Sequence, residues 1–480
     1  MIEAARAELL RLQGEAAPLE PGPGPRAALA SAAFAHAQHF LEDLADGPTY
    51  RGWRDAPAEA PVSEFADEGR SPDEVLTYLD RCVDRPGITT ASGRFMGYVP
   101  GGGLFHSAIG DFLAAASNKY AGFAPAAPGA VRLENATVAW LAGVIGFPAT
   151  AAGTLTSGGS LANLTAIVAA REARDDEGGG AVYLTRFAHH CIDKALRIAG
   201  RARAPRRLIA TDERHRMRAD ALAEALERDM GDGVRPWLVV ASAGTVDTGA
   251  VDPLAEIADL CERYAAWFHV DGAYGGLFML CEEGRRALRG IERADTAALD
   301  PHKTLFLPYG TGAVVARDGG TLFDAFSASA DYIRPFAETE VGPSPGDLSP
   351  ELTRHFRALR LWLPLQLAGV RAFRAAQSEK IGLARYFHAR LAAMAGWETG
   401  AAPDLSIVAF RYRPRRGEAD AFNRRLLQRL QEEGRVFLSG TRIDGADWLR
   451  CAILSFRTHL EHVDETLGVL AGLAAALEAE

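Results

Sequence analysis

Leu299-Asp300-Pro301-His302-Lys303-Thr304 places a lysine directly after a short apolar run, residues 296–299. We interpret this run as the end of a buried strand, so that Lys303 emerges at the sheet edge where α/β proteins bind ligands. Earlier in the chain, His269-Val270-Asp271-Gly272-Ala273-Tyr274-Gly275-Gly276 is a second predicted strand, which ends in the carboxylate of Asp271. The two strand ends predict an α/β sheet with a binding site at this edge.

An aspartate and a lysine at successive strand ends indicate pyridoxal 5′-phosphate (PLP). The lysine amine forms a Schiff base with the cofactor's aldehyde, and the aspartate keeps the pyridine nitrogen protonated, so the ring can accept electrons. Taken singly, most lysines are solvated surface charges, and a strand-end aspartate is commonly a helix cap or loop residue. Together, in this order, Lys303 and Asp271 favour a PLP site.

A turn rich in glycine and serine, Ser157-Gly158-Gly159-Ser160, offers a place for the phosphate of such a cofactor. It lies between a strand-like run that starts at Gly153 and a helix predicted over residues 161–174. Exposed N–H groups, hydroxyls and the helix dipole attract an anion there. The turn lacks the lysine of a P-loop and the spacing of a dinucleotide fingerprint, so it predicts a site for one phosphate.

Apolar runs and helical patterns alternate through the middle of the chain. Near-continuous apolar strands separated by helices predict a mostly parallel sheet that is covered on both faces. The predicted strands are 181–184, 207–210, 237–241, 267–270, 296–299 and 313–316, and the helices between them include 191–200, 218–228 and 253–264.

Three further features are predicted after Lys303. A strand pair is expected around Tyr309-Gly310-Thr311-Gly312, and one long helix over residues 348–373. Between them, residues 326–347 are poor in periodic apolar positions, and a loop of this length in a compact enzyme favours a lid over a simple connector.

The two ends of the chain form smaller parts. At the N-terminus, helices are predicted over residues 2–13, 28–44 and 72–83; they cannot bury much surface alone and are expected to pack on the body of the protein or on a second subunit. The tail predicts a small α/β unit. We therefore divide the chain into an N-terminal helical segment (1–85), a large PLP-binding domain (86–375) and a C-terminal small α/β domain (376–480).

Composition excludes several classes of partner. The chain has 480 residues, 48% of them hydrophobic, and a net charge of −10, which allows a large core and does not resemble a nucleic-acid-binding protein. The five cysteines have no metal-type spacing, so we expect a reduced, cytoplasmic protein without a metal site. Neither a signal peptide nor an apolar run of about 18 residues is found, so no membrane is expected as a partner.

Three more stretches can reach the predicted site. His189 follows a strand and opens a helix, where it can stack on a flat ring or cap the helix; no second cluster completes a zinc set with Cys191. Thr245 ends the next strand and can face a ring substituent. The loop at residues 94–105 is rich in glycine and aromatic residues and either lines a substrate pocket or packs as an ordinary loop.

These residues together resemble the group II PLP-dependent decarboxylases, which include the aromatic-L-amino-acid, glutamate and diaminobutyrate decarboxylases. The resemblance extends over nearly the whole chain and is most specific at residues 269–274, 300–303 and 352–359. It implies a fold-type-I PLP enzyme with a mostly parallel, seven-stranded central sheet. It also implies an obligate homodimer with active sites at the subunit interface and N-terminal helices that wrap the partner.

The resemblance assigns catalytic roles to four residues. Lys303 matches the Schiff-base lysine and Asp271 the partner of the pyridinium nitrogen. His189 matches the histidine that stacks on the cofactor ring. Tyr332, in the predicted lid, matches the tyrosine that helps to protonate the carbanion carbon after CO₂ leaves.

The resemblance assigns further contacts with the cofactor. Gly159, Ser160 and His302 match contacts to the phosphate. Ala273 matches the small residue packed against the second face of the ring, and Thr245 the threonine near the ring hydroxyl. The sequence departs from the family at Gly272, Val246, Leu161 and His190-Cys191, and none of these departures removes a catalytic group.

The predicted reaction is decarboxylation of an L-amino acid to the amine and CO₂. An aromatic substrate is our first expectation, because four aromatic residues offer apolar surface near the proposed pocket: Phe95, Tyr98, Phe105 and Phe123. Glutamate or 2,4-diaminobutyrate is the alternative within the same reaction class.

Two other classes of function stay open. One is a different PLP lyase or an oxidative aldehyde synthase on the same scaffold, although the presence of Tyr332 argues against the oxidative form. The other is a non-catalytic binding or structural relative, which would not need to keep Lys303, Asp271 and His189 together.

Overall fold

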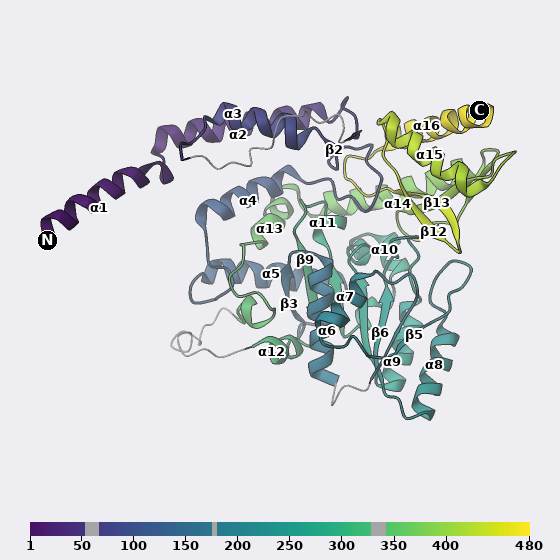
Figure 1. Ribbon diagram of the computed structural model, residues 1–480. Helices are drawn as coiled ribbons and strands as arrows, with labels where there is room; N and C mark the ends of the chain where they lie inside the picture. Colours follow the sequence, from purple (N-terminus) through teal and green to yellow (C-terminus); the bar gives the residue numbers. More distant parts are fainter. Residues whose placement is uncertain (53–66, 175–179, 328–341) are drawn as a thin grey trace. The chain divides into compact units, whose positions relative to one another are not determined.

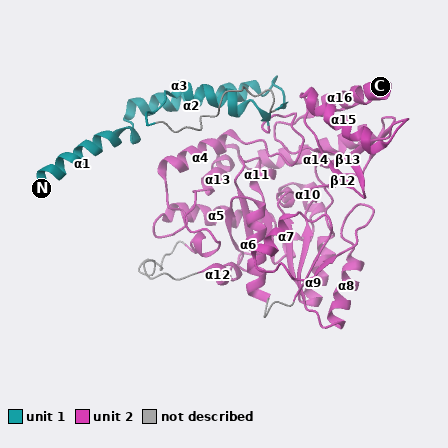
Figure 2. Cartoon of the chain, viewed as in Figure 1, with its two compact units in different colours: residues 1–89 teal, residues 90–480 magenta. Residues whose placement is uncertain are grey.

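The computed structural model describes residues 1–52, 67–174, 180–327 and 342–480. The chain forms two compact units, residues 1–89 and 90–480, which Figure 2 shows in different colours. Each unit is described by itself.

A seven-stranded sheet forms the centre of the larger unit (Figure 1). Its strands, in spatial order, are β3 (Ala152–Thr156), β9 (Gly312–Ala316), β8 (Thr296–Leu299), β7 (Trp267–Gly272), β6 (Pro236–Ser242), β4 (Ala181–Leu184) and β5 (Arg206–Leu208). β9 runs antiparallel to both of its neighbours, whereas the pairs from β8 to β5 are parallel. The prediction of a mostly parallel, seven-stranded sheet is confirmed.

Helices cover both faces of this sheet, as the apolar strands require. Alternate residues of β6 show this: Val239 and Ala241 belong to the same buried cluster as residues of α8 and α9, whereas Leu238 and Val240 pack in a cluster with residues of α6 and α7. The helices of this unit that precede or interleave with its strands are α4 (Phe105–Ser117), α5 (Pro128–Val144), α6 (Gly159–Arg174), α7 (Cys191–Ile198), α8 (Ala219–Gly231) and α9 (Leu254–Tyr264).

The elements around and after Lys303 differ in part from the prediction. Short helices α10 (Glu282–Ala287), α11 (Pro301–Thr304) and α12 (Gly320–Phe326) are present. The strand pair expected around residues 309–312 is wrong: residues 305–311 form no strand, and β9 begins at Gly312. The segment turns where Gly310 has a φ of 98°, a conformation that favours glycine and does not continue a strand.

The single long helix expected over residues 348–373 is also wrong. The chain is irregular up to Arg357, then forms α13 (Ala358–Ala368) and α14 (Val370–Ala392). Pro350 cannot donate a backbone hydrogen bond, and Gly369 adopts a φ of 75°, which ends one helix before the next begins.

A smaller antiparallel sheet occupies the C-terminal part of this unit. Its order is β10-β11-β13-β12, formed by β10 (Trp397–Thr399), β11 (Ile407–Tyr412), β12 (Ser439–Ile443) and β13 (Ala446–Ala452). Residues of α14, α15 (Ala419–Glu433) and α16 (Leu460–Ala479) share a buried cluster with this sheet.

The smaller unit is mainly helical, as expected. It contains α1 (Ile2–Ala16), α2 (Pro23–Asp43), α3 (Pro72–Leu79) and the two-residue strands β1 (Tyr50–Arg51) and β2 (Gly87–Ile88). α2 starts at Pro23, earlier than predicted, because a proline is tolerated in the first turn, where N–H groups lack helical partners. Among the described residues, no helix is long and apolar enough to span a membrane.

Candidate functional site

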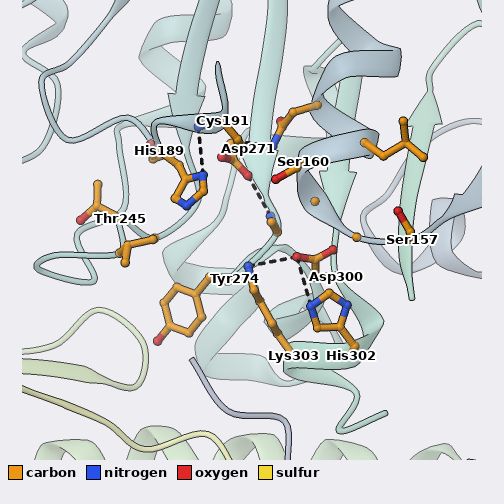
Figure 3. Close-up of a pocket in the computed structure, with 18 of the residues that line it drawn as sticks. Ser157, Ser160, His189, Cys191, Thr245, Asp271, Tyr274, Asp300, His302 and Lys303 are labelled. Atoms are coloured by element: carbon orange, nitrogen blue, oxygen red, sulfur yellow. Dashed lines mark hydrogen bonds and ion pairs between the residues drawn. The ribbon is translucent and has the colours of Figure 1, made fainter. Parts of the chain in front are cut away.

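A cavity of about 300 Å³ opens at the carboxyl ends of the central strands (Figure 3). Its lining brings together eight of the predicted site residues, which come from separate motifs: Gly159, Ser160, His189, Thr245, Asp271, Ala273, His302 and Lys303. The ninth, Tyr332, lies outside the described residues, as does most of the predicted lid.

Lys303 lies in α11, the single turn that follows β8. Its Nζ is 3.0 Å from Oδ2 of Asp300, and this ion pair is drawn in Figure 3. Burial lowers the pKa of Lys303, but the carboxylates of Asp300 and Asp271 outweigh this effect, so the pKa is raised above its usual value. The amine is therefore held as a cation until a ligand or a proton acceptor changes its surroundings.

Asp271 ends β7 on the strand next to β8, so its carboxylate and the Lys303 amine reach the cavity from neighbouring strands. Oδ1 of Asp271 accepts a hydrogen bond from the backbone N–H of Ala273, 3.2 Å away. This bond closes the turn after β7 and orients the carboxylate. An ionised carboxylate in this position can hold a cationic ring nitrogen.

Gly159 and Ser160 begin α6 at the edge of the cavity. A Cβ atom at Gly159 would lie 2.8 Å from Oδ2 of Asp300 and 2.9 Å from Cβ of Ala273, so only glycine fits here. The first N–H groups of α6 have no helical partners, and its dipole favours an anion. This cradle, the amine of Lys303 and the carboxylate of Asp271 together fit PLP, which has a phosphate, an aldehyde and a pyridine nitrogen.

Two histidines line the cavity, and one ring nitrogen of each forms a hydrogen bond with a known donor and acceptor. Nδ1 of His302 donates to the carbonyl oxygen of Thr311 over 2.7 Å, because a carbonyl can only accept. Nδ1 of His189 accepts from the N–H of Cys191 over 3.3 Å. Burial lowers the pKa of His189, although Asp271 opposes this, so the imidazole is uncharged and suited to stacking on a ring.

The cavity lining also contains residues that were not assigned a role from the sequence, among them Asp300, Asn163 and Tyr274. Asp300 belongs to the stretch that holds Lys303, but nothing in that stretch shows that its side chain turns back to the lysine. The hydroxyl of Tyr274 shares a 2.8 Å hydrogen bond with that of Ser406, a partner 132 positions away that no local pattern identifies.

The aromatic residues expected near the pocket do not line this cavity. Phe95, Tyr98, Phe105 and Phe123 are all absent from its lining, and Phe95 packs on Phe437 with ring centroids 5.5 Å apart. They were expected to offer apolar surface near the pocket, and the cavity is lined by other residues. The glycine-rich loop instead supports the turn of Lys303, as the close approach of Gly101 to the carbonyl of His302 shows.

Comparisons with known proteins identify the family of the chain. Residues 63–413 match the model of the pyridoxal-dependent decarboxylase conserved domain. The chain is 36% identical to the aromatic-L-amino-acid decarboxylase of Bacillus atrophaeus, over 86% of this chain and 88% of that protein. It is 34% identical to the L-2,4-diaminobutyrate decarboxylase of Rhizobium meliloti, over 73% of this chain and 72% of that protein.

The fold is also that of a solved relative. The crystal structure of Oryza sativa TDC with PLP and tryptamine superposes with a TM-score of 0.88 and covers 96% of this chain and 99% of that chain. The sequence identity is 24%, so the comparison concerns the fold. The seven-stranded sheet, its helical layers and the C-terminal antiparallel sheet all belong to this fold.

Proposed function

The chain belongs to the pyridoxal-dependent decarboxylase family, and we propose that it converts an aromatic L-amino acid to the corresponding amine and CO₂. The observation that carries the proposal is the meeting of Lys303, Asp271 and the Gly159–Ser160 cradle in one cavity. The aromatic substrate is supported by the similarity to the Bacillus atrophaeus enzyme. It is also supported by the lining, which contains no arginine among the described residues to receive an acidic side chain.

Each proposed role follows from the chemistry of the residue. PLP, when bound, supplies an electron sink for the bond to the carboxylate. Lys303 would bind the aldehyde of the cofactor, and Asp271 would stabilise a positive charge on its ring nitrogen. His189 and Ala273 would contact the ring, Gly159, Ser160 and His302 would hold the phosphate, and Thr245 would lie near the ring hydroxyl.

Tyr332 is proposed to return a proton to the substrate carbon after CO₂ has left. We expect Tyr332→Phe to suppress amine formation and to divert substrate to the aldehyde through reaction with oxygen. Chromatographic analysis of amine and aldehyde from one incubation measures this division. Unchanged amine formation would remove Tyr332 from the proton transfer.

A homodimer and a cytoplasmic location complete the proposal. The outer face of α4 carries exposed apolar side chains at Ile109, Phe112 and Leu113, which a second copy of the chain would cover. α1 and α2, which lie within the described residues, bury no residue of their own. The five cysteines are free thiols, which suits a reducing compartment.

The test is the release of CO₂ and amine from a panel of L-amino acids with added PLP, with Lys303→Ala as control. Amine from tyrosine, tryptophan, phenylalanine or dihydroxyphenylalanine, and none from Lys303→Ala, is the expected result. Release only from glutamate or diaminobutyrate would keep the reaction and overturn the substrate. A variant Lys303→Ala with full activity would rule out the role given to this lysine.

A further inference from the structure

A chain of hydrogen bonds lies behind the wall of the cavity. The indole Nε1 of Trp267 donates to Oγ1 of Thr296 over 3.1 Å, and Oγ1 of Thr296 is 2.9 Å from Nδ1 of His269. Nε2 of His269 is 2.7 Å from Oδ1 of Asn163, whose Nδ2 donates to Sγ of Cys191 over 3.4 Å. All five residues are at most 5% exposed, and Asn163 and Cys191 also line the cavity.

The chemistry of the groups determines which atom donates and which accepts in each of these hydrogen bonds. The indole can only donate, so the hydroxyl of Thr296 accepts from Trp267 and is left to donate to Nδ1 of His269. Nε2 of His269 then carries the proton and donates to the amide oxygen of Asn163. Reversing the Asn163 amide would force a proton onto Nδ1 and leave the Thr296 hydroxyl without an acceptor.

The charge state of His269 agrees with this assignment. Burial lowers the pKa of the imidazole to about 4, although Asp271 opposes the shift. Among the described residues, Thr296 and Asn163 form hydrogen bonds with the ring, and both are neutral. The imidazole is therefore uncharged at neutral pH, as the hydrogen-bond pattern requires.

This series of hydrogen bonds joins four elements that lead to the predicted site. Asn163 is in the first turns of α6, which starts at the Gly159–Ser160 cradle. His269 is two residues before Asp271 on β7, and Thr296 starts β8, which leads to Lys303. Cys191 begins α7, directly after His189 and His190. From its place on β7, the imidazole of His269 thus contacts Asn163 of α6 and Thr296 of β8.

We propose that His269 is a positioning residue that sets the distance between the anion cradle of α6 and the carboxylate of Asp271. The inference rests on the proposed function, because it concerns a rigid ligand held at both ends. Such a ligand binds tightly through both contacts only if the distance between the two protein groups matches its length. A small displacement of either group therefore weakens binding. Without His269, α6 loses its buried link to β7.

The test compares two probes on the cofactor-free protein: PLP, and pyridoxal, which lacks the phosphate. The ratio of their dissociation constants, from absorbance titrations, measures what the phosphate contact contributes when the ring is also bound. We expect His269→Leu to reduce this ratio by roughly tenfold to hundredfold. His269→Gln, which keeps a donor and an acceptor, should restore part of the loss.

Tyr183→Phe is the matched control. Tyr183 is in β4 of the same sheet, and its hydroxyl makes a buried 2.6 Å hydrogen bond to Asp229 of α8, but Tyr183 does not line the cavity. The control should lower the thermal unfolding midpoint and leave the ratio unchanged. An unchanged ratio in His269→Leu, or equal losses in His269→Leu and Tyr183→Phe, would overturn the positioning role.

Two further outcomes remain distinct. If His269→Leu does not fold, Thr296→Val removes two hydrogen bonds of the series, those to Trp267 and His269, with little change of volume. The same reduction of the ratio is then expected, and an unchanged ratio overturns the proposal. If the unaltered protein binds PLP no more tightly than pyridoxal, the proposed cofactor site itself fails. A high ratio that survives the substitutions would refute only the role of His269.

Discussion

At the residue scale, Asp300 is the group that most directly controls the candidate lysine. Its side chain is 2% exposed; Oδ2 lies 3.0 Å from the Lys303 amine and 3.7 Å from Nε2 of His302. Oδ1 is buried without a hydrogen-bond partner in the described structure. A buried carboxylate with one unpaired oxygen holds a nearby cation strongly, because nothing else balances its charge.

We therefore expect Asp300→Asn to lower the pKa of Lys303, because the substitution removes the larger of the two carboxylate effects that raise it. A larger fraction of the amine is then neutral at a given pH, and only the neutral amine is a nucleophile. Cofactor-free Asp300→Asn should capture PLP faster than the unaltered protein near neutral pH, as followed by stopped-flow absorbance. An identical dependence of the rate on pH would contradict this role.

Sequence alone identified much of the site at this scale, but not all of it. Lys303, Asp271 and Ser160 each stand at the end of a predicted strand or the start of a helix, and parallel strands bring such ends to one edge. His269 and Asn163 are 106 positions apart, and their contact depends on how α6 lies on the sheet. Local patterns carry no information on that packing.

At the element scale, the glycine-rich loop before α4 supports the turn that carries Lys303. A Cβ atom at Gly101 would lie 2.0 Å from the carbonyl oxygen of His302 and 3.2 Å from that of Lys303. Both are backbone atoms, so no side chain can move aside. We expect Gly101→Ala to cost about 1–3 kcal/mol of stability, and to weaken PLP binding by displacing the lysine.

Urea unfolding and PLP titration measure the two effects of Gly101→Ala. Gly129→Ala is the control, because Gly129 lies in α5 with nothing within 4 Å of its added Cβ. It should leave PLP binding unchanged and stabilise the helix slightly. Equal behaviour of the two variants would show that the loop does not constrain the turn.

A buried ion pair joins α5 to the irregular segment before α13. The guanidinium of Arg354 lies 2.8 Å from Oε1 of Glu134 and donates to Oγ1 of Thr154 over 2.6 Å. Burial raises the pKa of Glu134 and lowers that of Arg354, which reflects the cost of taking both charges out of water. The pair offsets that cost only while both partners are present.

Arg354→Ala should therefore destabilise the protein by about 3–5 kcal/mol, since it leaves Glu134 buried without its counter-charge. Arg286→Ala, which breaks an exposed pair with Glu282 in α10, should change stability by less than about 1 kcal/mol. Equilibrium unfolding in urea compares the two. A small effect of Arg354→Ala would mean that Glu134 becomes protonated at little cost.

Element boundaries were predicted well where burial is continuous and poorly where it is not. β4 and β8 coincide with the expected strands, because each is a short apolar run buried along its whole length. The segment over residues 348–357 was expected to be helical, but Arg354 there donates to the carbonyl oxygen of Leu155 and Arg357 to the carboxylate of Glu351. Tertiary contacts of this kind override a local helical pattern.

At the scale of the whole molecule, the proposed dimer gives a prediction that a single chain does not satisfy. Phe112 on α4 is 61% exposed beside Ile109 and Leu113, and a large exposed aromatic in an apolar patch favours association. We expect Phe112→Glu to shift the protein toward a monomer in sedimentation velocity and to reduce decarboxylation with it. Ile198→Glu, at another exposed apolar position, should leave the mass unchanged.

A dimer that persists in Phe112→Glu would place the interface elsewhere. The position of the proposed interface could not be predicted from residue patterns, because the sequence does not show which apolar side chains are exposed and which are buried. The order of the central strands was equally inaccessible: β9 lies between β3 and β8, although β3 precedes it by more than 150 positions.

That position of β9 has a consequence for how the protein is made. β3 hydrogen-bonds within the central sheet only to β9, so it has no place there while the ribosome is still translating the segment before Gly312. The long segment between β3 and β9 must close into a loop before their hydrogen bonds can stabilise the sheet. This makes the pairing a slow step in folding. The serine and glycine turn after β3 and the lysine before β9 therefore come together at the same late moment. A nascent chain halted before β9 would expose an unpaired apolar strand and have no formed pocket for its cofactor.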